Sequence, residues 1–202
     1  MSLTNYQLTQ TPIGSLPSVT LVLSETTDKT KWESWQKRIG FLEASYIRRQ
    51  AIERGKKLDS EIQYFFETGW VDQSEYFQQS YSVISEFTEH QLQQLVWHPA
   101  GYCGKFDYLG TDRTGQSVLV EWKTSTKPRP KEWTIDAQLQ AVAYLKAAEY
   151  SKRITINEAR VVYCITDHQI PDIYPIKGDK INQLFEQFCV RLNIFYRQLE
   201  GF

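Results

Sequence analysis

The chain has 202 residues, of which 41% are hydrophobic and 23% charged, and its formal net charge at pH 7 is −1. This length and composition fit one globular domain with its own core and exclude a disordered chain. No apolar run approaches the roughly 20 residues of a membrane span, and the near-neutral charge argues against tight non-specific binding of duplex nucleic acid. The charge is uneven, however. Leu58–Gly104 contains seven acidic residues and no Lys or Arg, and basic residues cluster on both sides of it.

The three cysteines, Cys103, Cys164 and Cys189, are far apart in the sequence. Because they form no CxxC pair, they indicate neither a zinc site nor an iron–sulfur cluster. Such a cysteine pattern is most simply explained by a reducing compartment, and we expect a cytoplasmic protein. Residues 1–24 carry no Lys, Arg, Asp or Glu. They therefore contain neither an Arg-rich transit peptide nor the basic region of a secretory signal, and we expect no targeting segment.

The first half of the chain is predicted to be largely helical. Residues 1–17 are polar and interrupted by Pro and Gly, which predicts an irregular lead-in. Ser18 is a suitable N-cap for a short helix. Residues 30–67 read mostly as helix, which Gly69 ends. The Gln-rich and aromatic-rich residues 73–94 have helical character without a clear apolar face.

The apolar period then changes to that of strands. Strands are predicted at Leu95–Trp97, Tyr102–Leu109, Ser117–Lys123 and Ala159–Thr166. Helices are predicted at Trp133–Tyr150 and Asp179–Leu199, with a basic, Pro-rich loop at residues 124–131. This order of elements predicts an α/β fold with a mixed central β-sheet flanked by helices. We take residues 18–202 as a single domain with a helical insertion around residues 59–94.

The segment from Asp107 to Lys123 contains the residues best suited to catalysis. A turn near residues 112–114 would pair the flanking strands and place Asp107 opposite Val120 or Glu121. Glu121 and Lys123, two residues apart, share one face of their strand. Facing carboxylates repel each other, a conflict that a divalent cation removes. A Mg²⁺ ion is typically bound by one or two carboxylates, and water and phosphate fill the rest of its coordination shell. A lysine beside the ion can stabilise developing negative charge. A surface salt bridge between Glu121 and Lys123 would explain the same spacing.

Several motifs, in order, resemble those of PD-(D/E)xK nucleases of the RecB type. They are Asp107, the triplet Glu121-Trp122-Lys123, and the helix QLQAVAYL with Gln140 and Tyr144 four residues apart. Upstream, RGKKLD resembles the family's helix motif, with Asp59 where the family has a metal-binding His. The segments LPSVTLVL, KWESWQKR, EWKTSTKPRP and DAQLQAVAYLKA are similar to those of the mitochondrial genome maintenance exonucleases and their bacterial and phage relatives. This similarity covers about residues 17–167.

The resemblance implies a restriction-endonuclease-like core and a Mg²⁺- or Mn²⁺-dependent exonuclease that acts on single-stranded DNA ends, encoded by a bacterium or phage. It implies that Asp107, Glu121 and Asp59 hold the metal. Lys123, Gln140 and Tyr144 would complete the catalytic set. Contacts to the DNA backbone are expected from Arg54, Thr124, Ser125, Lys127 and Arg129. Trp133 is the best candidate for stacking on a base, whereas Trp122 should be buried.

Two other functions fit the same residues. A restriction-like or repair endonuclease would share the fold but would cut a circular single strand, which an exonuclease cannot do. A nucleic-acid-binding module with a decayed site is favoured only by Asp59 in place of His, and the intact Asp107, Glu121 and Lys123 argue against it. Gln140 and Tyr144 could also be an ordinary polar pair on a half-buried helix.

Overall fold

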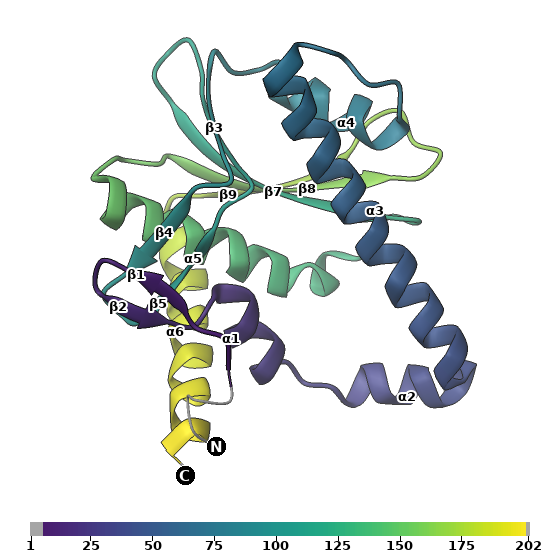
Figure 1. Cartoon of the computed structure of the whole chain (residues 1–202), viewed down its shortest axis with the longest axis vertical. Helices are drawn as coiled ribbons and strands as arrows, with labels where there is room; N and C mark the ends of the chain where they lie inside the picture. The colour runs from purple at the N-terminus through teal and green to yellow at the C-terminus, as the bar shows by residue number, and fades with distance from the viewer. Residues whose placement is uncertain (1–5, 201–202) are drawn as a thin grey trace.

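A five-stranded mixed sheet lies at the centre of the fold (Figure 1). The structure is a computed structural model and describes residues 6–200. The strands, in spatial order, are β3 (Glu89–Leu92), β6 (Tyr108–Thr111), β7 (Ser117–Ser125), β8 (Glu158–Ile165) and β9 (Asp172–Lys177). Only β7 and β8 are parallel, and the crossover between them contains helix α5 (Ile135–Lys152). The other neighbours are antiparallel, which confirms the predicted mixed sheet.

Two small ribbons and the remaining helices surround this sheet. The ribbons pair β1 (Thr9–Thr11) with β2 (Gly14–Leu16), and β4 (Leu95–His98) with β5 (Tyr102–Lys105). The other helices are α1 (Val19–Thr26), α2 (Thr30–Ile39), α3 (Phe41–Thr68), α4 (Glu75–Ile84), the 3₁₀ turn η2 (Lys131–Trp133) and α6 (Asp179–Glu200). No helix within residues 6–200 is both long enough and apolar enough to cross a membrane.

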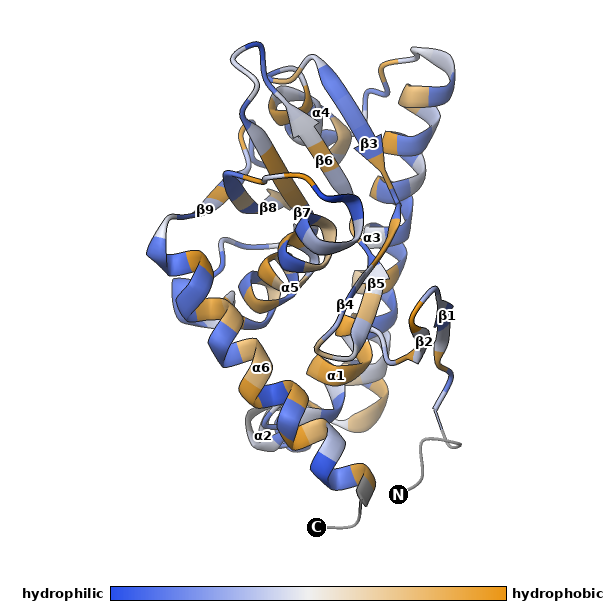
Figure 2. Cartoon of the chain, turned by 90° about the vertical axis from the view of Figure 1, so that its left-hand side faces the viewer, coloured by the Kyte–Doolittle hydropathy of each residue, from blue (hydrophilic) through white to orange (hydrophobic). Residues whose placement is uncertain are grey.

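Helices cover both faces of the sheet, so each face has its own apolar core. On one face, α1, α5 and α6 pack over residues such as Leu119 and Val161. On the other face, α3 and α4 pack over residues such as Val118 and Trp122. Hydropathy alternates along α6 in Figure 2, as expected for a helix with one apolar side. Because successive residues of a strand point to opposite faces, β7 serves both cores at once.

Local signals place the helix ends as the sequence predicts. The Ser18 hydroxyl accepts a hydrogen bond from the Leu21 amide at 3.1 Å, which caps α1. Gly69 ends α3 in the left-handed conformation, with φ of 74°. The helical stretch predicted at residues 30–67 is confirmed but interrupted at Gly40, whose φ of 92° separates α2 from α3. Figure 1 shows α2 and the first half of α3 extending away from the sheet.

The predicted irregular lead-in is wrong for residues 9–16, which form the β1–β2 ribbon. Of the residues taken as signs of an irregular segment, Pro12 lies in the hairpin turn and Gly14 begins β2. Gly14 has φ of 120°, and the Thr11 hydroxyl donates to the Gly14 carbonyl oxygen at 2.7 Å. Residues 1–5 of the predicted lead-in lie outside the described residues.

One predicted strand is divided in the structure, and two strands of the sheet were not predicted. The strand predicted at Tyr102–Leu109 is two strands, because β5 pairs with β4 whereas β6 pairs with β3 and β7. β3 lies in the region predicted to be helical. It is a polar edge strand without the apolar alternation that marks a strand. β9 was missed because Pro175 lies within it, which a sheet tolerates at an edge. The boundary of the helical insertion at residues 59–94 stays a prediction; these residues form the end of α3, α4 and β3.

Candidate active site

The β6–β7 hairpin brings the two predicted carboxylates together. Tyr108 pairs with Val120 and Leu109 with Leu119, so Asp107, just before β6, comes opposite Glu121 as predicted. Oδ2 of Asp107 accepts a hydrogen bond from the main-chain amide of Trp122 at 2.9 Å. This bond fixes Asp107 against β7, although Asp107 itself lies outside a strand.

The buried Glu121 and the half-buried Lys123 form an ion pair on one face of β7. Lys123 Nζ donates to Glu121 Oε1 at 2.7 Å and to Gln140 Oε1 at 3.1 Å. Glu121 is 1% exposed, so the alternative of a surface salt bridge is wrong. The second carboxylate oxygen, Glu121 Oε2, is buried and has no hydrogen-bond partner among the described residues. A buried carboxylate oxygen without a donor is costly, and a cation would satisfy it.

Helix α5 supplies the two residues behind this pair. Gln140 and Tyr144 lie one turn apart on the same face of α5, and Gln140 accepts the second hydrogen bond from Lys123. Burial, followed by the charges of Glu121 and Asp107, raises the pKa of Tyr144, which therefore stays a neutral phenol. The ring lies against Gly104 of β5, where an added Cβ would be 2.6 Å from Tyr144 Cε1. Gly104 therefore makes the room that Tyr144 occupies.

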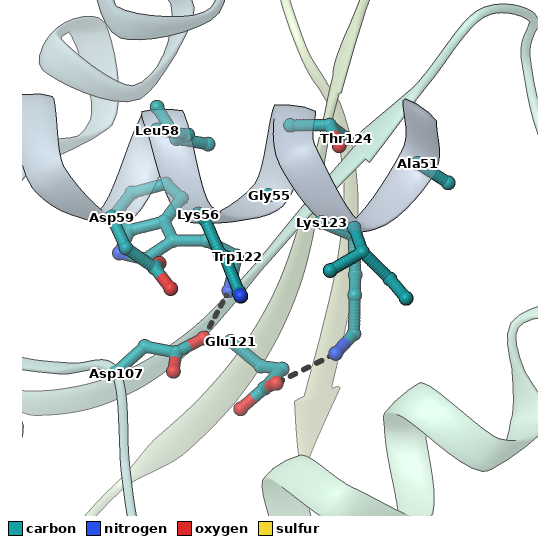
Figure 3. A pocket seen from close by; sticks show the side chains of 11 residues that line it. Ala51, Gly55, Lys56, Leu58, Asp59, Asp107, Glu121, Trp122, Lys123 and Thr124 are labelled. Atoms are coloured by element: carbon teal, nitrogen blue, oxygen red, sulfur yellow. Dashed lines mark hydrogen bonds and ion pairs between the residues drawn. The ribbon is translucent and has the colours of Figure 1, made fainter. Parts of the chain in front are cut away.

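A pocket of about 320 Å³ opens in front of the carboxylates. It is lined by α3 residues between Ala51 and Asp59, by Asp107, and by β7 from Glu121 to Thr124. Figure 3 shows the carboxylates of Asp59, Asp107 and Glu121 directed from three separate segments towards one space. Within the described part of the chain, no three His, Cys, Asp or Glu side chains form a ready metal-ligand cluster. Asp59 thus borders the pocket without completing a three-ligand set.

The carboxylates influence each other and the lysine. Burial raises the pKa of Asp107 well above its usual range, and the charges of Glu121 and Asp59 add to this, against Lys123 and the Trp122 amide. Burial and then Glu121 raise the pKa of Asp59, while Lys123 lowers it. Burial opposes the charge on Lys123, but Glu121 and Asp107 outweigh it and raise the lysine pKa. Lys123 is therefore held protonated. The repulsion among the three carboxylates opposes their simultaneous ionisation.

The end of β7 and the basic loop after it contain four of the five predicted DNA contacts. Thr124 lines the pocket and is half-buried. Ser125 is buried, donates to the Lys127 carbonyl oxygen at 2.6 Å and accepts from Arg129 Nε at 3.1 Å. Ser125 and Arg129 thus shape the loop, whereas the Lys127 side chain is exposed.

The remaining predicted contacts, Trp133 and Arg54, do not line the pocket. Trp133, in η2 beside the loop, is 63% exposed, whereas Trp122 is buried, as predicted. Arg54 is half-buried on α3 but does not line the pocket. A Cβ at Gly55 would meet no atom within 4 Å, so the lack of a side chain at Gly55 is not needed for close packing of α3 against the sheet. Its missing side chain instead leaves open space at the pocket wall.

One charged residue of the pocket was not predicted as a site residue from the sequence. Lys56 lines the pocket from α3 and is directed towards the carboxylates in Figure 3. The sequence did contain a signal for it, because Lys56 lies three residues before Asp59 and so shares its helical face.

Comparison with known proteins reveals a sequence relationship that covers most of the chain. No family model matches the chain. The chain is 31% identical over 171 residues to mitochondrial genome maintenance exonuclease 1 of Mus musculus, an alignment that covers 74% of this chain and 50% of that protein. The chain therefore spans about half the length of this curated relative. This homology, together with the motifs gathered at the pocket, fits a PD-(D/E)xK nuclease, as the sequence motifs predict.

Solved structures give weaker resemblances. A putative exonuclease from Eubacterium rectale has a TM-score of 0.46 and 14% identity, covering 75% of this chain and 68% of that chain. An alkaline exonuclease from Laribacter hongkongensis has a TM-score of 0.43 and 16% identity, covering 91% of this chain and 87% of that chain. Similarity at this level does not identify a function.

Proposed function

We propose that the chain is a metal-dependent DNA exonuclease that hydrolyses phosphodiester bonds from single-stranded ends. The observation that carries this is the pairing of two carboxylates, Asp107 and Glu121, at an open pocket beside the protonated Lys123. The homology to an exonuclease supports the same activity. We also infer the RecB-type arrangement of motifs, because the helix with Gln140 and Tyr144 lies directly behind the lysine.

The residues at the pocket suit a divalent cation. Glu121 Oε2 is buried without a partner, and Asp107 uses only Oδ2 for the Trp122 amide, which leaves Oδ1. Hard oxygen donors of this kind select Mg²⁺ or Mn²⁺, which need only one or two carboxylates because water and phosphate complete their shell. Such an ion would supply Lewis-acid chemistry that activates water and offsets phosphate charge. Asp59 would be a further acidic ligand, and a carboxylate in place of His favours Mg²⁺ over transition metals.

The protein's own side chains divide the remaining work. Lys123, held by Glu121 and Gln140, presents a fixed positive charge that stabilises the negative charge developing on the phosphate. Gln140 positions this ammonium group, and Tyr144 lies one turn further along the same face of α5. The Trp122 amide orients Asp107. Each of these groups is fixed before substrate arrives, so little reorganisation is needed during the reaction.

The surroundings of the pocket fit a single strand held by its backbone. Thr124, Lys127, Arg129 and Arg54 would contact phosphates, with Ser125 shaping the loop between them. Contacts to phosphate carry no sequence information, so we expect little sequence preference. Trp133, exposed beside this loop, offers a face on which any base can stack.

End-labelled linear and circular single strands test the proposal directly. With Mg²⁺ or Mn²⁺, the linear strand should be degraded and the circle of the same sequence should stay intact. Cleavage of the circle would make the chain an endonuclease of the same fold. Binding of both substrates with no cleavage in any divalent metal would instead indicate a decayed binding module.

A further inference from the structure

Lys56 is the second lysine at the pocket, and it comes from the opposite wall to Lys123. Lys123 extends from the sheet, on β7, whereas Lys56 extends from helix α3. Figure 3 shows the Lys56 side chain directed towards the space that Asp59 and Asp107 border. A strand entering the pocket would therefore pass between two ammonium groups.

The two pocket lysines differ in what already binds them. Lys123 is committed to Glu121 and Gln140. Lys56 is exposed, and among the described residues its ammonium group makes no ion pair within 4.0 Å, although carboxylates line the same pocket. Its neighbour Lys57 pairs instead with Glu61 at 3.5 Å, one turn along the helix. Lys56 is thus the pocket cation whose donors are free for a ligand.

The formal charge of the pocket shows what that ligand should be. With all three carboxylates ionised, as metal binding requires, Asp59, Asp107 and Glu121 contribute three negative charges and the two lysines two positive charges, giving −1. A divalent cation changes this to +1. One phosphodiester then makes the pocket neutral, and removing either lysine would leave it negative. A lysine ammonium is a common partner of phosphate in proteins.

We propose that Lys56 binds a backbone phosphate of the substrate strand and so holds the strand against the α3 wall of the pocket. This inference rests on the proposed nuclease function and assigns one substrate contact to it. Lys56 acts in binding rather than in the chemical step, because it approaches from the exposed helix whereas Lys123 is already fixed beside Glu121. Loss of this contact should raise KM and leave kcat nearly unchanged.

The test compares Lys56→Ala with Lys57→Ala, which removes the same charge from the next residue on the helix. Binding is followed by the fluorescence anisotropy of a labelled single-stranded DNA oligonucleotide in Ca²⁺, under conditions where the probe stays intact. Lys56→Ala should weaken binding and raise KM about tenfold, and should reduce the slope of log affinity against log salt by about 0.7, the value for one single-strand phosphate. Lys57→Ala should do neither, and Lys56→Arg should restore most of the affinity.

A neutral methylphosphonate placed at one linkage after another locates the contact. At one linkage it should weaken binding by wild type about tenfold and leave binding by Lys56→Ala unchanged. The inference is overturned if Lys56→Ala behaves like Lys57→Ala, or if it loses kcat with KM and salt slope intact. It is also overturned if Lys56→Ala lowers the melting temperature and Lys56→Arg fails to restore affinity, which would mark a structural role.

The wild-type protein tests the proposed nuclease function separately from the role of Lys56. If wild type binds the probe but cleaves no strand, the nuclease function fails, and the salt slope still decides the role of Lys56. If wild type neither binds nor cleaves, both proposals fail.

Discussion

Replacing Gly104 with Ala tests how firmly Tyr144 is held behind the site. The added Cβ would lie 2.6 Å from Tyr144 Cε1 and 3.2 Å from the hydroxyl oxygen. Carbon atoms in contact prefer about 3.5–4.0 Å, so the ring would have to move by about 1 Å. Tyr144 is 3% exposed and belongs to the large core on that face of the sheet, so no free space can take the ring. Gly104 has no positive φ, so backbone strain does not enter.

The expected cost is that of one extra carbon in a packed core, about 1–3 kcal/mol. Each kcal/mol lowers the melting temperature of a domain this size by about 2–4 °C, so the expected drop is roughly 2–12 °C. The displaced ring lies one helical turn from Gln140, which accepts from Lys123 Nζ at 3.1 Å. A misplacement of about 1 Å at catalytic groups reduces rates by up to about a hundredfold, so kcat should fall as well.

Gly55→Ala is the matched control, because a Cβ there meets nothing within 4 Å. In the middle of α3 this change should raise stability by about 0.5–1 kcal/mol. Thermal unfolding followed by circular dichroism, without metal or DNA, measures both variants. The account of Tyr144 is refuted if Gly104→Ala melts at or above the wild-type temperature and keeps the wild-type kcat.

Other predictions concern the carboxylates and the metal. A divalent cation at about 100 times its Kd should stabilise the protein by about 2.7 kcal/mol, which raises the melting temperature by roughly 5–11 °C. Asp107→Ala should lose most of this shift. Glu67→Gln, an exposed control on α3, should keep it. Because the folded-state pKa of Asp107 is raised, its contribution to stability is present below the ordinary carboxyl pKa of about 4 and is lost as pH rises through the folded value. Metal-free wild type should therefore lose stability relative to Asp107→Asn as pH rises from about 4 to neutrality, which melting curves across pH can measure. Asp59→His should keep activity and shift the preferred ion from Mg²⁺ towards Mn²⁺; full activity of Asp59→Ala in both metals would remove Asp59 from the ligand set. Degradation should favour single-stranded ends and fall steeply with salt, and efficient digestion of a blunt duplex would contradict this.

The part of the site built on one hairpin was predictable from the sequence. The distance from the turn fixes the register, so Asp107 comes opposite Glu121, and the two-residue period puts Lys123 on the same face. The helical spacing of Gln140 and Tyr144 likewise gave their shared face. Local periodicity carries this information because each pair lies on one element or on two directly joined strands.

The rest depends on tertiary packing that local pattern does not contain. Nothing in the sequence around Gly55 shows whether its open side faces the sheet or the pocket, since that depends on how far α3 stands from β7. The role of Lys56 depends on the same placement. The strand break at Phe106 and Asp107 was hidden because the apolar pattern continues through it, although β5 and β6 join different sheets. The edge strands β3 and β9 lack a strong apolar period because most of their residues stay partly or fully exposed to solvent.

The central claim is that Asp107, Glu121 and Lys123 hydrolyse DNA together with a divalent metal, and Lys123→Ala tests it most directly. Degradation of an end-labelled linear single strand in Mg²⁺ is compared for wild type, Lys123→Ala and the exposed control Lys57→Ala, with DNA affinity measured in parallel. Wild type and Lys57→Ala should shorten the strand, and EDTA should stop them. Lys123→Ala should bind metal and DNA nearly as well but cleave at least a hundredfold more slowly, because the lysine stabilises charge only in the transition state. Undiminished cleavage by Lys123→Ala, or wild-type cleavage that persists in EDTA, would contradict the account.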